Sequence, residues 1–184
     1  MAISNWMAWE GGVDLVALTD KSLSQPNVIV HAARMVHTPK GSAASGMILY
    51  QPDPKGTPLA MGFIGHDLEI GKYFGPKIFA GTPFEQAPVL AANIEVWTKL
   101  PGSVGCKIKV GNLLFEATFS ELGPLELISR APSAMPPFHQ QGLEAKAGKV
   151  SLKVNGKDIP LIVPPVGITG GPAAVWAPCG IYAR

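Results

Sequence analysis

The segment Gly105–Ser120 reads GCKIKVGNLLFEATFS and by itself predicts an antiparallel β-hairpin. Apolar and polar residues alternate up to Gly111-Asn112, a two-residue turn with glycine first, and they alternate again beyond it. Folding the chain at this turn places Lys107 opposite Glu116, which is a favourable cross-strand pair. The pairs expected on the other, apolar face are Val110 with Leu113, Ile108 with Phe115, and Cys106 with Ala117.

A second hairpin is predicted over Val150–Val163. The apolar residues alternate on both sides of Asn155-Gly156, a dipeptide typical of two-residue hairpin turns. Lys153 then faces Asp158 across the strands. Pro160 has no N–H to donate, so its strand is expected to lie at an edge or to end in a bulge there.

Further short extended segments follow the same pattern along the chain. The expected strands are Asn27–Val36, Gly46–Gln51, Leu59–Ile64, Val89–Lys99, Leu125–Arg130 and Ala174–Tyr182. Val13–Leu18 fits either a strand or one helical turn, and Asn27–Met35 is ambiguous between strand and helix. About eight strands with short connections predict one mostly β domain over residues 1–184, a barrel or a cone-like curled antiparallel sheet with at most one or two short helices.

The composition narrows the classes of partner. Charged residues make up 15% of the chain, against about 25% in typical domains, while 47% of the residues are hydrophobic. A net charge of +2 gives no basis for binding nucleic acid or an anionic membrane surface. No apolar stretch approaches the roughly 20 residues of a membrane-spanning helix. The excess of apolar residues therefore predicts a deep core, a cavity or a homo-oligomer interface.

The ends of the chain and its cysteines suggest a cytoplasmic protein. Met1–Trp6 lacks the basic region and apolar run of a signal peptide. Cys106 and Cys179 have no metal-ligand spacing and are expected to be free thiols.

The four histidines, His31, His37, His66 and His139, do not form a local metal site. In an extended segment His31 and His37 share a face but lie about 20 Å apart. In a helix they fall on different faces. We therefore expect no metal and no cofactor.

Candidate catalytic residues come from two neighbouring stretches. His66 and Glu69 belong to a polar cluster inside an apolar context, where either could transfer protons or contact a ligand, or could belong to a solvated turn. Lys77 lies in the apolar window Tyr73–Ala80. Burial would favour its neutral amine, which attacks carbonyl compounds to form imines. Alternatively, its stem packs on Phe79 while its head reaches water.

Aromatic and apolar side chains near these stretches are candidates for contact with an apolar ligand. They are Phe74, Tyr73, Phe115 and Met61.

The region around Lys77 also carries a resemblance. An apolar strand, Leu59–Gly62, leads through the acidic Glu69 to an aromatic-Pro-Lys segment, Phe74–Lys77, and then to a strand–turn–strand, Val104–Thr118. This arrangement over Pro58–Leu127, about a third of the chain, resembles the middle of acetoacetate decarboxylase-like proteins. The resemblance implies a related β fold with a closed apolar cavity.

One departure from that family bears on the chemistry. The family carries two adjacent lysines after the proline, and the second lowers the pKa of the first. Here Ile78 follows Lys77. The sequence thus leaves three hypotheses. The first is an enzyme, a lyase or an isomerase, that uses Lys77, His66 or Glu69 in a cavity; the second is a binding protein for a small apolar metabolite; the third is a structural or assembly protein.

Overall fold

The computed structural model describes residues 5–184 and contains eleven strands and one helical segment. The expectation about the signal peptide concerns Met1–Trp6, of which residues 1–4 lie outside the described part. The strands are β1 (Trp6–Ala17), β2 (Val28–Thr38), β3 (Gly41–Tyr50), β4 (Ala60–Gly65), β5 (Val89–Lys99), β6 (Ser103–Val110), β7 (Leu113–Leu122), β8 (Glu126–Arg130), β9 (His139–Val154), β10 (Lys157–Ile159) and β11 (Ala174–Ala183).

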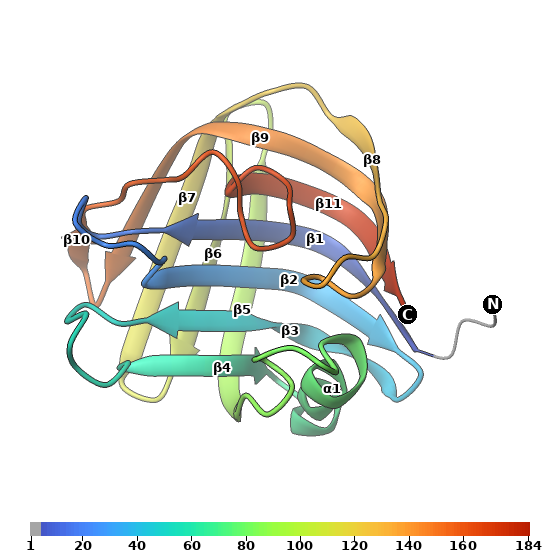
Figure 1. The fold of residues 1–184 in the computed structure, drawn as a ribbon. Helices are drawn as coiled ribbons and strands as arrows, with labels where there is room; N and C mark the ends of the chain where they lie inside the picture. Colours follow the sequence, from blue (N-terminus) through green and yellow to red (C-terminus); the bar gives the residue numbers. More distant parts are fainter. Residues whose placement is uncertain (1–4) are drawn as a thin grey trace.

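The strands form one curled sheet that closes in a ring (Figure 1). The order is β10-β9-β11-β1-β2-β3-β4-β5-β6-β7, and β7 pairs back to β9. All pairings are antiparallel except β4–β5, which is parallel and joins only three residue pairs. In Figure 1, β5, β6 and β7 cross behind the strands of the front of the ring. The ring therefore consists of two curved layers joined through β5 and β9, rather than a regular barrel.

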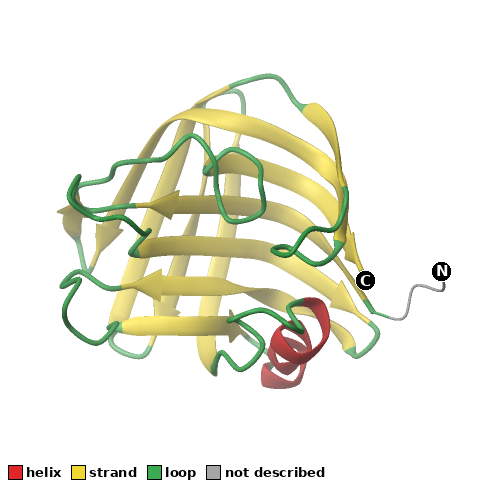
Figure 2. Ribbon diagram, in the orientation of Figure 1, coloured by secondary structure: helices red, strands yellow, loops and turns green. Residues whose placement is uncertain are grey.

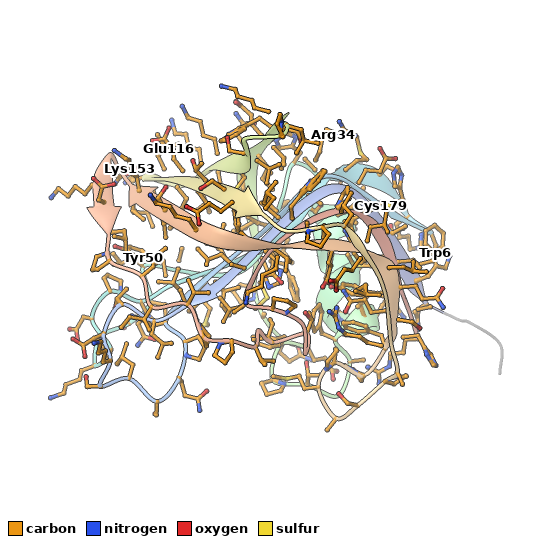
Figure 3. The ribbon with its side chains drawn as sticks, turned by 90° about the horizontal axis from the view of Figure 1, so that it is seen from above. Trp6, Arg34, Tyr50, Glu116, Lys153 and Cys179 are labelled. Atoms are coloured by element: carbon orange, nitrogen blue, oxygen red, sulfur yellow. The ribbon has the colours of Figure 1, made fainter. Side chains whose placement is uncertain are left out.

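The first predicted hairpin is confirmed in detail. Strands β6 and β7 pair in the expected register, including Lys107 opposite Glu116, with an Nζ–Oε1 distance of 3.6 Å. Gly111 has a φ of 55°, the left-handed conformation that a glycine-first turn requires. In Figure 3, Glu116 lies beside Lys153, because the next strand, β9, pairs these residues.

The second hairpin is shorter than predicted. Lys153 pairs with Asp158 as expected, and Asn155 and Gly156 both have positive φ. Strand β10 ends at Ile159, and the extension to Val163 is wrong. The physical reason is Pro160, which has no N–H to continue the ladder. The first strand is longer than predicted, since β9 reaches back to His139.

The remaining strands confirm the mostly β class and resolve two ambiguities. Val28–Thr38 and Trp6–Ala17 are strands, so neither ambiguous segment is helical. The helical residues are Leu68–Ile78, in which helix α1 (Leu68–Tyr73) continues as a wider turn (Figure 2). Among residues 5–184, no helix has the length and apolar character needed to cross a membrane.

Apolar side chains fill both sides of the layer β11-β1-β2-β3-β4. On one side, the main core packs this layer against β5, β6, β7 and β9, with Phe115 and Phe119 fully buried. On the other side, a second cluster packs it against the helical segment and Phe138. This second side is where the cavity of the molecule lies.

Candidate functional site

A cavity of about 90 Å³ lies between the second side of the layer and the segments that cover it. Its walls come from β1–β4 and β11, from the helical segment, from β9 and from the loop between β10 and β11. Figure 1 shows that loop crossing in front of β1 and β11, with α1 at one corner. Because one buried water needs about 10–15 Å³ of such space, the cavity has room for several waters or a small organic molecule.

The wall of the cavity is largely aromatic. Phe74 stacks on Phe63 at a ring-centroid distance of 5.5 Å, and Phe63 contacts Phe79 at the same distance. The ring centroids of Trp9 and Tyr182 are 4.7 Å apart. All five line the cavity. Such a wall favours an apolar ligand, with orientation left to a few polar groups.

Two of those polar groups come from adjacent strands. Asp14 on β1 is opposite His31 on β2 in the sheet register, so the two side chains share one face. Asp14 Oδ1 lies 3.2 Å from His31 Nδ1, and both residues line the cavity. However, neither Asp14 Oδ1 nor His31 Nε2 has a hydrogen-bond partner among the described residues, although both atoms are buried.

Burial favours the uncharged form of both partners. Desolvation raises the pKa of Asp14 well above its ordinary value; the nearby Glu144 carboxylate adds to the rise and Arg130 opposes it. Desolvation lowers the pKa of His31 to about 4. Both shifts favour the neutral forms, although the 3.2 Å distance would also suit opposite charges. Buried polar atoms without partners are rare in native proteins, and each one needs an explanation.

A charged network lies at the edge of the same cavity. Arg130 on β8 donates to both carboxylate oxygens of Glu144 on β9, at 2.8 and 2.7 Å. Gln140 accepts from Arg130 at 3.0 Å and donates to Glu144 at 3.2 Å. The hydrogen bonding of Arg130 to the Glu144 carboxylate is the main reason that the pKa of Arg130 is raised. The Arg130 charge is therefore paired with the Glu144 carboxylate, and the network adds no net charge to the cavity.

The loop between β10 and β11 closes over this network. Ile168 and Thr169 line the cavity, and Gly171 lies against the Arg130 guanidinium. A Cβ at position 171 would be 2.4 Å from Arg130 Nη2. The glycine-rich sequence of this loop thus allows a close backbone approach to an arginine.

The predicted catalytic residues do not line the cavity. Lys77 is exposed, so the burial on which the imine hypothesis depended is absent. Glu69 is exposed and pairs with Lys72 at 2.6 Å. His66 is exposed, and its Nε2 lies 2.9 Å from Asn93 Oδ1 and from the Ile94 N–H. The structure does not bring these three residues together with the polar pair.

The predicted ligand-contact residues divide between the cavity and other places. Phe74 lies in the cavity wall. Tyr73 is buried beside it, and its hydroxyl accepts from the Trp6 N–H at 3.2 Å. Phe115 belongs to the main core, while Met61 is 49% exposed.

The sequence reasoning missed Asp14 and misplaced one histidine. A carboxylate inside the apolar run Val13–Leu18 was the available signal, since charge is costly in a buried strand. His31 and His37 were expected to share a face of the strand, and this is wrong. The register shifts between Ala33 and Val36, so His31 lines the cavity while His37 lies on the opposite, outer face.

Within residues 5–184 no group of three His, Cys, Asp or Glu side chains could hold a metal ion.

Comparisons of the chain with protein-family models, with curated proteins and with solved structures gave no match.

Proposed function

We propose that this cavity binds a small, uncharged and largely apolar molecule whose hydroxyl or carbonyl oxygen hydrogen-bonds to the Asp14–His31 pair. The supporting observation is the pair of unpartnered buried atoms, Asp14 Oδ1 and His31 Nε2, in an otherwise aromatic cavity. An unsatisfied buried polar atom costs about 1–3 kcal/mol. A ligand oxygen removes that cost, so its binding is favoured over that of a plain hydrocarbon.

The charge state of the site supports an uncharged ligand. Asp14 and His31 favour their neutral forms, and Arg130 is already neutralised by two hydrogen bonds to Glu144. A ligand carboxylate would meet no free positive charge there and would lose its hydration. We therefore expect discrimination against charged analogues of the same size.

Methyl groups inside and outside the cavity allow a direct binding test. Met7 and Met47 line the cavity, whereas Met61 and Met135 are exposed and serve as internal controls. The probes are acetophenone, 1-phenylethanol, ethylbenzene and benzoate, which share a ring and differ in the polar group. The readout is the set of methionine methyl signals in ¹H–¹³C spectra.

We expect acetophenone or 1-phenylethanol to shift the Met7 and Met47 signals saturably and to leave Met61 and Met135 unchanged. Benzoate should give no saturable shift. In His31→Leu, the affinity for the two oxygen-bearing probes should fall about tenfold and that for ethylbenzene should not. Absence of saturable shifts at Met7 and Met47 with both oxygen-bearing probes would refute the proposal.

A further inference from the structure

A separate chain of hydrogen bonds lies on the outer face of the sheet, outside the cavity. Ser42 Oγ is 2.7 Å from His37 Nδ1, and His37 Nε2 is 2.9 Å from Glu10 Oε1. Arg34 Nη2 donates to the other Glu10 oxygen at 3.3 Å. We call Ser42, His37 and Glu10 the outer-face chain. A serine, a base and an orienting carboxylate in this order are the parts of an activated nucleophile.

The strand pairing holds this chain in place. Ser42 is opposite His37 in the β2–β3 register, so their side chains are neighbours on one face. The register of β2 against β3 shifts between Ala33 and Val36, which marks a bulge in β2, and Gly11 on the neighbouring β1 has a positive φ. This bulge turns His37 outward, whereas an unbroken strand would have kept it on the face of His31. Bulges often redirect a side chain in this way beside functional sites.

The hydrogen bonds fix which ring nitrogen acts as the base. The hydrogen bond from His37 is the main reason that the pKa of Glu10 is lowered, so Glu10 is an ionised carboxylate that only accepts. The neutral His37 ring must therefore carry its proton on Nε2. Its Nδ1 then presents a lone pair to the Ser42 hydroxyl, 2.7 Å away.

We propose that Ser42 is the nucleophile of a hydrolytic site that takes aryl esters of short apolar acids. Ser42 is exposed, so a substrate reaches its hydroxyl from solvent. Across the sheet, His37 pairs with Ala8 on β1, and Ala8 pairs with Ile181 on β11. Ile181 is exposed and therefore offers apolar surface to an acyl group near Ser42. An aryl leaving group departs readily, so the reaction depends mainly on the attack step.

The reaction proceeds in two steps, acylation of Ser42 and hydrolysis of the acyl-serine. Ser42 Oγ forms a bond to the ester carbonyl carbon while His37 Nδ1 takes the hydroxyl proton. The bond to the aryl oxygen breaks, and the released phenol takes that proton from His37. Water then attacks the acyl-serine with His37 again as the base, which frees the acid and restores the Ser42 hydroxyl.

The test uses the full chain and a fluorophosphonate, which labels activated serines, followed by tryptic mass spectrometry. Ser42 lies in the peptide 41–55 and is distinguished by fragmentation from the buried Ser45. Ser22 lies in the peptide 22–34 and is the internal control. Ser22 is exposed, and its hydroxyl donates to Asp20 Oδ1 at 2.7 Å rather than to a histidine ring.

We expect Ser42 to be labelled about 100-fold faster than Ser22, the usual lower contribution of a general base. His37→Gln should reduce labelling of Ser42 to the Ser22 rate, while Glu10→Gln should reduce it partly. The Ser22 rate should stay the same in both variants, which shows that the reagent acts on them equally, and a cooperative urea unfolding transition reports that each variant is folded. Labelling of Ser42 at the Ser22 rate in the unaltered chain, or undiminished labelling in His37→Gln, would overturn the proposal.

Discussion

The burial of His31 predicts a specific loss of stability in acid. The pKa of His31 falls from its ordinary value of 6.5 in the unfolded chain to about 4 in the folded protein. Between these values the unfolded chain binds a proton that the folded protein does not. Stability therefore falls as the pH falls through this window. Each unit of pKa difference corresponds to about 1.4 kcal/mol. His31 therefore lowers the free energy of unfolding by about 3 kcal/mol at pH 4 relative to pH 7.

The measurement must separate His31 from Asp14, which acts in the opposite direction. The pKa of Asp14 is raised by burial, so its contribution to stability recovers as the pH falls. The relevant quantity is therefore the difference in unfolding free energy between the unaltered chain and His31→Leu, from urea titrations at pH 7, 6, 5 and 4. We expect this difference to shift by about 3 kcal/mol in favour of the variant.

Substitution of the exposed His139 by Gln serves as the control and should give no comparable shift. If the difference between the unaltered chain and His31→Leu stays constant from pH 7 to pH 4, His31 is solvated. The description of the cavity would then be wrong.

Four further predictions concern stability, reactivity and assembly. Glu144→Gln should lower the free energy of unfolding in urea by about 3 kcal/mol, because it leaves the Arg130 charge partly buried without its partner. Glu116→Gln removes one partner of an exposed pair and should lower it by less than about 1 kcal/mol. Equal losses in the two variants would contradict the burial argument. Gly171→Ala should lower the thermal midpoint, since Arg130 is held at both nitrogens and has to move; an unchanged midpoint would show that the loop adapts freely. A thiol reagent should modify the exposed Cys179 and not Cys106, whose thiol pKa burial raises to about 12; equal rates would contradict this assignment. We also predict a homodimer that covers exposed apolar side chains such as Leu127, which is 83% exposed; light scattering that gives 19.3 kDa at all concentrations would exclude it.

The parts of the fold that sequence predicts well are those fixed by neighbouring residues. The register of β6 and β7 follows from the alternation of apolar and polar residues and from the two-residue turn between the strands. The pairing of Ile108 with Phe115 could therefore be predicted directly from the sequence. Asn155-Gly156 fixes the second hairpin in the same way. Such local signals also predicted a curled, mostly β domain.

The candidate site depends on contacts that no local pattern encodes. Asp14 and His31 meet because β1 and β2 pair, and the cavity over them is closed by residues more than a hundred positions away, such as Thr169. The bulge in β2 between Ala33 and Val36 exchanges the faces of that strand, so the alternation that placed His37 on the same face as His31 failed. Lys77 stood out because its neighbours are apolar, but a helical turn directs it to solvent.

The most direct test of the central claim is a crystal structure of the protein with 1-phenylethanol. The account predicts the ring among Phe63, Phe74 and Phe79 and the hydroxyl oxygen within about 3 Å of His31 Nε2. A cavity that holds no ligand at saturating 1-phenylethanol, or a ligand whose oxygen points away from both Asp14 and His31, would contradict it.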